Sequence, residues 1–176
     1  SPPMYLESAD KPYVEPPLGI LYLAAVLEKA GFNVEVLDCV VEDPTIRSLG
    51  QGWYHFGLDY EQIERALKRA HADAICISTM FSNLADLSNK IAEIAKSVYP
   101  DAPVIQGGLH PTVAPLRTLE NRYTDFVVIG EGEETLVELI MSLDTAQSFS
   151  GIKGIGYKTE NGDLKINPKR GLIKNL

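Results

Sequence analysis

The sequence predicts an α/β domain with a doubly wound parallel sheet, of the Rossmann or flavodoxin-like type, followed by a small C-terminal β-hairpin. Two observations predict this fold class. Short apolar stretches alternate with amphipathic stretches along most of the chain, which is typical of parallel strands joined by helices that cover both faces of a sheet. After residue 150 this rhythm changes, and two short β-prone stretches flank Asn161-Gly162, a strong hairpin signal.

Composition and charge exclude several function classes. The chain has 176 residues and a net charge of −8, which makes it a poor candidate for nucleic-acid binding, because that needs clustered Lys and Arg. Its longest apolar run, Leu18 to Leu27, is far shorter than the roughly 20 residues of a membrane span. Cys39 and Cys76 are too few for a disulfide framework, fit a cytoplasmic protein, and are expected to be buried in strands. We expect no nucleic-acid and no membrane partner.

The first half of the chain contains two predicted helices and one predicted strand. Leu18 to Ala30 is apolar on nearly all sides and stops at a glycine, as a buried helix does. Asn33 to Cys39 is typical of a strand, whereas Asp43 to Leu58 has no clear period and is expected to be a long loop. Asp59 caps the next helix, with Gln62 in the capping-box position.

The second half repeats a unit of strand and helix. The predicted elements are strands at 72–78, 102–106 and 124–129, helices at 83–98 and 131–143, and one or two helical turns within 111–120. Asn83 is the expected cap of the first of these helices. The hairpin follows at 156–159 and 164–167. The predicted organisation is an α/β domain over 1–150, then the hairpin and a linker over 151–176.

The opening of the chain departs from this rhythm. A helix at Leu18 should follow a strand and its loop, but the preceding residues begin Ser1-Pro2-Pro3 and read as loop throughout. We therefore expect the first strand of the sheet to be missing from this chain. The alternative is a minimal strand over Met4 to Leu6.

Ligands of such sheets bind outside the carboxyl ends of the strands. This rule selects four loops, Asp38–Pro44, Ser78–Asn83, Gly107–Pro111 and Gly130–Glu133. Gly107-Gly108 lets a backbone approach a ligand closely or makes a tight turn. His110 is either a ligand contact or a packed side chain. Trp53 to Phe56, in the predicted long loop, forms a lid or covers part of the core.

Two of these loops point to the chemistry of a ligand. Ser78 to Ser82 offers hydroxyls and two large apolar side chains, which suit a large, flat, partly apolar ligand, or alternatively cap a helix and pack in the core. The acidic turn Gly130 to Glu133 disfavours phosphate and suits hydroxyl or amide donors, although carboxylates also stabilise a helix start. The dinucleotide motif G-x-G-x-x-G is absent because Thr135 stands at its third glycine, and the motif G-x-x-x-x-G-K-[ST] is absent too.

Six segments then occur in a specific order and spacing. They are SPP, PPLGILYLAAVLEKAGFNVEVLDC, ADAICIS, VIQGGLHPTVAP, DFVVIGEGEETLVELI and GIKGIGYK followed by NP. Together they resemble the N-terminal cobalamin-binding domain of cobalamin-dependent radical S-adenosylmethionine (SAM) enzymes. The resemblance covers nearly the whole chain. It implies a cobalamin at the carboxyl edge of a five-stranded parallel sheet, with its nucleotide tail between the sheet and the loops.

The resemblance also implies which residues contact cobalamin. Pro17, Leu18, Gly19 and Tyr22 would shape the corrin edge, and Ser78, Thr79, Met80, Phe81 and Ser82 would lie near the lower corrin face and the tail. Gly107, Gly108 and His110 would border the tail, Gly130, Glu131, Gly132 and Glu133 would contact tail hydroxyls or corrin amides, and Asp38 belongs to the same set. No catalytic residue and no protein metal ligand is expected.

The resemblance leads to two further expectations. The motif D-x-H-x-x-G, which supplies a cobalt-ligating His in other cobalamin proteins, is absent because residues 1–17 contain no His. The motif C-x-x-x-C-x-x-C, which holds the [4Fe-4S] cluster beside SAM, is also absent, so the radical SAM domain of the parent chain is expected beyond Leu176. In that parent, cobalt would carry a methyl group from SAM to a substrate radical, or cobalamin would serve another radical reaction such as ring closure.

Three alternatives compete with this interpretation. A flavodoxin-like FMN-binding domain needs a Ser/Thr-rich phosphate loop after its first strand, but residues 1–17 offer only Ser1 and Ser8. A receiver domain needs an Asp where Ser78-Thr79 stand. A non-catalytic cobalamin sensor or interaction module stays open.

Overall fold

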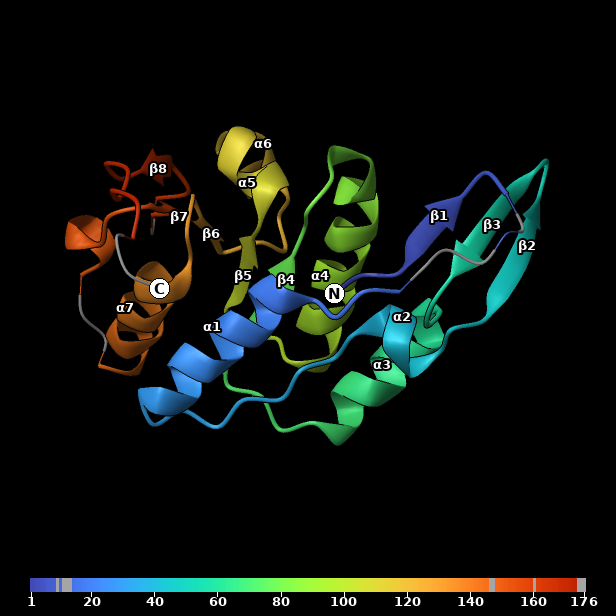
Figure 1. The fold of residues 1–176 in the computed structure, drawn as a ribbon. Helices are drawn as coiled ribbons and strands as arrows, with labels where there is room; N and C mark the ends of the chain where they lie inside the picture. Colours follow the sequence, from blue (N-terminus) through green and yellow to red (C-terminus); the bar gives the residue numbers. More distant parts are fainter. Residues whose placement is uncertain (9, 11–13, 146–147, 160, 174–176) are drawn as a thin grey trace.

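The computed structural model describes residues 1–8, 10, 14–145, 148–159 and 161–173 and contains two sheets (Figure 1). The strands of the main sheet, in spatial order, are β4 (Ile75–Ser78), β5 (Val104–Gly107), β6 (Phe126–Val128), β7 (Ile155–Lys158) and β8 (Leu164–Ile166). β4, β5 and β6 are parallel, whereas β7 and β8 are antiparallel to their neighbours. The α/β class is confirmed, but the prediction of a wholly parallel sheet is wrong.

The reversal at β7 has a local cause. The chain returns to the carboxyl end of β6 before β7 begins, since the amide of Ile129 donates to the carbonyl of Gly154 at 2.8 Å. β7 therefore starts where β6 ends and must run the opposite way. The predicted hairpin forms from β7 and β8 and extends the main sheet. The proposed boundary at residue 150 stays a prediction.

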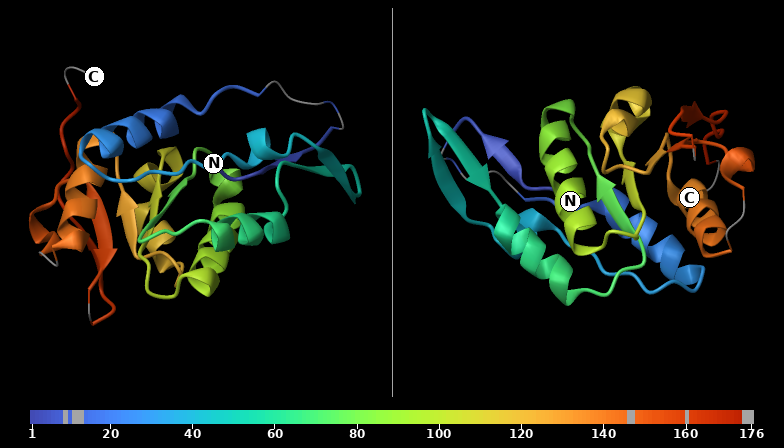
Figure 2. Two further views of the ribbon diagram at one scale, coloured as in Figure 1. Left: turned by 90° about the horizontal axis from the view of Figure 1, so that it is seen from below. Right: turned by 180° about the vertical axis from the view of Figure 1, so that it is seen from behind.

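Helices cover both faces of the main sheet, as predicted for a doubly wound fold (Figures 1 and 2). On one face, Ile105, Phe126 and Val128 pack with residues of α1 (Leu18–Lys29) and α7 (Glu133–Asp144). On the other face, strand residues pack with α3 (Tyr60–Arg69), α4 (Ala85–Val98) and α6 (Pro115–Glu120). Within the described ranges, none of the helices has the length and apolar character needed to cross a bilayer.

Helix starts were predicted with mixed success. The capping box of α3 is confirmed, because Asp59 and Gln62 each accept a hydrogen bond from the other's backbone amide. The predicted cap at Asn83 is wrong: a 3-10 turn, η1 (Ser82–Leu84), precedes α4 and no side chain caps the helix. The predicted turns within 111–120 are confirmed as α5 (Leu109–Val113) and α6.

The predicted strand at 33–39 does not form. Residues 32–38 are irregular, and Cys39 begins a short helix, α2 (Cys39–Glu42), whose first turn is capped by the Asp38 carboxylate. A strand needs a neighbour along its length, whereas this segment is bonded near its end to Ser1, whose amino group donates to Leu37 and whose carbonyl accepts from Cys39. Cys39 is buried but helical, and Cys76 lies in β4 with an exposed side chain, so the expectation for both cysteines is wrong in part.

The predicted loop at 43–58 contains a hairpin instead. β2 (Ile46–Gly50) and β3 (Trp53–Phe56) pair antiparallel, and β1 (Met4–Leu6) pairs with the other side of β3. Met4 to Leu6 thus forms a strand, as the alternative had it, but in a separate small sheet that projects from the body of the domain (Figure 1). Phe56 is fully buried there and Trp53 is exposed, so this segment forms core as well as surface.

Candidate functional site

The carboxyl edge of β4, β5 and β6 brings three of the four selected loops together. Ser78 pairs directly with Gly107 across β4 and β5. Beyond the paired residues, the amide of Thr79 donates to the carbonyl of Gly107 at 2.8 Å, and the amide of His110 donates to the carbonyl of Thr79 at 3.0 Å. The loops after β4 and β5 are therefore held together by their backbones.

Gly108 makes this close approach sterically allowed. Its φ of +103° and ψ of −171° lie in a region that is essentially restricted to glycine. A Cβ on Gly108 would lie 2.7 Å from the carbonyl oxygen of Thr79. Gly107 differs, since the nearest atom to a Cβ there is 3.8 Å away, on Val128. Of the two predicted roles, the tight turn belongs to Gly108.

Thr79 is directed into the core. Its side chain is fully buried, and its hydroxyl lies 2.8 Å from the hydroxyl of Ser88 and 3.3 Å from the amide oxygen of Gln106. These contacts tie the end of β4 to α4 and β5. Thr79 therefore supports the loop after β4 from the core side.

Met80 and Phe81 stand in solvent at the same edge. Their side chains are 52% and 63% exposed, so the alternative in which they pack in the core is not what forms. Large exposed apolar side chains that gather in one place mark binding surfaces. Leu109, on α5, adds another exposed apolar side chain to the neighbouring loop.

His110 is a packed side chain that links two loops. It is buried, and its Nδ1 lies 3.0 Å from the Ser82 hydroxyl. Burial, followed by the nearby positive charge of Arg117, lowers the pKa of His110 below its ordinary value. A neutral ring in this place connects the β4–α4 loop to the β5–α5 loop.

The carboxylates of the acidic turn after β6 differ in their hydrogen bonding. An oxygen of Glu131 accepts a hydrogen bond of 2.6 Å from the amide of Ile173 in the C-terminal segment. Gly132 lets α1 pack closely, since a Cβ there would lie 3.0 Å from Leu23. In Glu133, the first residue of α7, Oε2 is buried and has no hydrogen-bond partner among the residues that the structure describes. Buried polar atoms almost always have partners, so this acceptor fits a group supplied by a ligand.

The start of α1 presents a second set of predicted residues. Leu18 and Tyr22 are 63% and 55% exposed, and no atom of the described residues lies within 4 Å of a Cβ built on Gly19. Pro17 and Asp38 line a groove of about 380 Å³, and its lining includes no residue of the loops after β4, β5 and β6. The other residues that line it are Val14, Pro16, Leu21, Val36, Val41 and Glu42.

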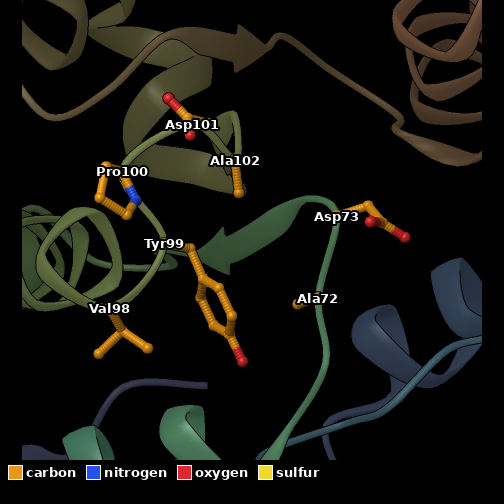
Figure 3. A pocket seen from close by; sticks show the side chains of 7 residues that line it. All are labelled: Ala72, Asp73, Val98, Tyr99, Pro100, Asp101 and Ala102. Carbon is orange, nitrogen blue, oxygen red and sulfur yellow. The ribbon is translucent and has the colours of Figure 1, made fainter.

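A second hollow, of about 420 Å³, lies at the opposite, amino-terminal edge of the sheet (Figure 3). It is lined by residues of the connections into β4 and β5, including Asp73, Tyr99 and Asp101. None of the predicted site residues contributes to it. Its position at the starting ends of the strands separates it from the ligand edge of this fold class.

The three histidines do not offer a free imidazole at the ligand edge. His55 lies in β3, where its Nε2 is 2.9 Å from the carbonyl oxygen of Leu58. His71 follows α3 on the way into β4, at the amino-terminal edge. Across the described parts of the chain, no group of three or more His, Cys, Asp or Glu residues is arranged to hold a metal ion.

Thr112 is a residue of this edge that the sequence analysis missed. Its hydroxyl donates to the carbonyl of Gly108 at 2.8 Å and accepts from the amide of Gly130 at 2.9 Å. The loop after β6 is thereby tied to the loop after β5. The spacing of Thr112 and Gly108 is a signal for the first bond, because Thr in a helix often bonds the carbonyl four residues earlier.

Comparison with known proteins agrees with this geometry. A family model described as the B12 binding domain matches residues 9–140. The chain is 32% identical over 170 residues to cytidylyl-2-hydroxyethylphosphonate methyltransferase of Streptomyces wedmorensis and 33% identical over 162 residues to an uncharacterized methyltransferase of Pyrococcus horikoshii. These alignments cover 95% and 92% of the chain but 32% of each relative, so the chain spans about a third of their length.

Solved structures share the fold. The radical SAM methyltransferase TsrM from Kitasatospora setae superposes with a TM-score of 0.70 at 22% identity, over 90% of this chain and 28% of TsrM. The cobalamin-dependent radical SAM enzyme OxsB, with aqua-cobalamin and SAM bound, gives 0.70 at 23% identity, over 92% of this chain and 20% of OxsB. The chain belongs to the B12-binding domain family and is related to the cobalamin domains of radical SAM enzymes.

Proposed function

We propose that this chain binds cobalamin at the carboxyl edge of β4, β5 and β6, as the cofactor domain of a radical SAM methyltransferase. Methyl transfer is supported by the names of the two relatives that are 32% and 33% identical to the chain. The domain with the [4Fe-4S] cluster and SAM, in the same parent chain, is the proposed partner. TsrM, which shares the fold, has been solved with both cobalamin and a [4Fe-4S] cluster bound.

The observation that carries the proposal is the combination of surfaces at this edge. Cobalamin has a broad corrin face, amide side chains and a nucleotide tail with hydroxyl groups. The exposed side chains of Met80, Phe81 and Leu109 fit an apolar face. The unpartnered oxygen of Glu133 fits an amide or hydroxyl donor.

The remaining predicted residues have distinct proposed tasks. The open space over Gly130, where no described atom lies within 4 Å of a built Cβ, leaves room for a ligand to approach the backbone. Leu18, Gly19 and Tyr22, at the start of α1, would border the corrin edge. Pro17 and Asp38 line the groove beside the start of α1 and are also proposed to contact cobalamin.

Cobalamin, when bound, supplies the methyl-carrying chemistry, and the protein's residues hold it and exclude competing ligands. Since His55 and His110 already have hydrogen-bond partners and His71 lies at the other edge, we expect no protein imidazole on cobalt. The chain would therefore hold the cofactor without a bond from a protein histidine to cobalt.

A reconstitution experiment tests this function. The purified 176-residue chain is mixed with hydroxocobalamin and desalted, and the visible spectrum of the protein fraction is recorded. We expect cobalamin to be retained, with a spectrum that lacks imidazole ligation from the protein. A protein fraction free of cobalamin would contradict the proposal, and a spectrum with protein imidazole on cobalt would contradict its account of the cobalt ligand.

A further inference from the structure

One side chain joins the loop after β5 to the loop after β6. The hydroxyl of Thr112 donates to the carbonyl of Gly108 and accepts from the amide of Gly130, at 2.8 and 2.9 Å. We infer that Thr112 is a positioning residue for cobalamin, which sets the path of the acidic turn after β6 relative to the glycine turn after β5. The inference rests on the proposed function of this edge.

Thr112 is itself held in place by its surroundings. Thr112 belongs to α5, and its own amide donates to the same Gly108 carbonyl at 3.2 Å. Next to it, His110 is anchored twice, by its backbone to Thr79 and by its ring to Ser82. The loops after β4 and β5 thus fix the position of the Thr112 hydroxyl. The hydrogen bond from the Gly130 amide to this hydroxyl in turn restrains the position of Gly130.

Gly130 is a sensitive place for such a bond. Its φ is +84°, and no atom of a described residue lies within 4 Å of a Cβ built on it, so the described side chains do not pack against this residue. Three residues later α7 begins with Glu133, whose buried oxygen has no partner within the described part of the chain. The bond from Gly130 to Thr112 therefore restrains the turn that presents this acceptor. A turn that is ordered before binding costs less free energy to fix in the complex.

The chain offers a matched control for Thr112. Thr118, on α6, makes the same bond to the carbonyl four residues earlier, Ala114, at 3.0 Å. Among the described residues, that hydroxyl makes no bond to another loop. Thr112→Val and Thr118→Val each remove one hydroxyl and one such bond at equal side-chain volume, but only Thr112→Val also removes the tie to Gly130. Thr112→Ser keeps the hydroxyl and should behave like wild type.

Two measurements on the 176-residue chain test the inference, with the urea midpoint of each variant measured alongside. In the ligand-free chain, Thr112→Val should speed amide hydrogen exchange at 130–132 by roughly tenfold, while Thr118→Val and Thr112→Ser leave it unchanged. In a titration with hydroxocobalamin, Thr112→Val should raise Kd by roughly tenfold, and the two other variants should bind as wild type does.

The outcomes separate the inference from the proposed function. Unchanged exchange at Gly130 in Thr112→Val would show that the hydroxyl does not restrain the turn and would overturn the inference. The inference also fails if Thr112→Val binds hydroxocobalamin as tightly as wild type, or if Thr118→Val weakens binding equally. Failure of the wild-type chain to bind hydroxocobalamin would instead overturn the proposed function, and with it the role assigned to Thr112.

Discussion

Replacing Gly108 with Ala tests whether the two loops at the ligand edge need the close approach that the structure shows. The new Cβ would lie 2.7 Å from the oxygen, 3.0 Å from the carbonyl carbon and 3.1 Å from the nitrogen of Thr79. All three are backbone atoms of a buried residue, so the conflict cannot be relieved by turning a flexible side chain. Relief requires the turn to move away from Thr79, which strains the bond from the His110 amide to Thr79.

The cost has two parts. Placing a residue with a Cβ at this φ and ψ costs about 1–3 kcal/mol, and the forced displacement of packed atoms adds about 1–3 kcal/mol. We therefore expect Gly108→Ala to lower the free energy of unfolding by about 4 kcal/mol, a large part of the about 5–15 kcal/mol that stabilises a domain. Urea unfolding followed by the fluorescence of Trp53, the one tryptophan, measures the change.

Gly31→Ala is the matched control. Gly31 follows α1 with a φ of +95°, but nothing in the described structure lies within 4 Å of a Cβ built there. That variant should therefore lose only the conformational part, about 1–2 kcal/mol. Equal losses in the two variants would refute the argument that the backbone of Thr79 leaves no room beside Gly108.

Three further predictions concern other parts of the chain. Glu133→Gln should raise the Kd for hydroxocobalamin by roughly tenfold in a titration, because a neutral amide accepts a hydrogen bond from the cofactor more weakly than a carboxylate does. The control Glu120→Gln, at an exposed site, should leave that Kd unchanged. Equal effects of the two variants would argue against a contact between Glu133 and cobalamin. The free energy of unfolding should fall as the pH drops below 6.5, because burial lowers the pKa of His110 in the folded chain and the unfolded chain therefore binds the proton more readily. In urea titrations at several pH values, the free energy of unfolding of His110→Asn should depend less on pH than that of wild type. The same pH dependence in both proteins would exclude His110 as the cause. Gly156→Ala should lower the free energy of unfolding by about 1–3 kcal/mol in a urea titration, because its Cβ would lie 2.5 Å from a methyl of Ile166; a variant as stable as wild type would show that the β7–β8 packing adapts.

Local patterns in the sequence were sufficient to predict the longer helices and the central strands, but not the short helix α2. Residues close together in the sequence produce the apolar stripes of α3 and α4 and the Asp59 capping box. They also produce the short apolar runs that form β4, β5 and β6. The direction of β7 was not predictable in this way. It depends on where the chain returns after α7, which is seen only in the contact between Ile129 and Gly154.

The segment at 33–39 also shows that local patterns do not determine strand pairing. Its alternation predicted a strand, but a strand requires a hydrogen-bonding neighbour along its length, and this segment instead meets Ser1 near its end. Conversely, the irregular, glycine-containing stretch at 43–58 carried no strand signal, yet it pairs as β2 and β3 and with β1. Pairing between distant segments overrides local preference in both places.

The candidate site was predictable as a set of loops but not as a set of contacts. The rule that ligands bind at the carboxyl ends of parallel strands selected the loops after β4, β5 and β6, and the structure brings them together. It did not predict that His110 would bond to Ser82, 28 residues earlier, or that Thr112 would reach Gly130. Both bonds join loops whose separation in space is set by the sheet.

A hydrogen-exchange footprint of hydroxocobalamin on the 176-residue chain tests the central claim most directly. The claim predicts slower amide exchange at 78–82, 107–112 and 130–133 when hydroxocobalamin is present. The amino-terminal hollow around Asp73 and Tyr99, which opens at the other edge, is the internal control and should exchange as before. Protection confined to that hollow, or none at the three loops, would contradict the account of cobalamin binding at the carboxyl edge.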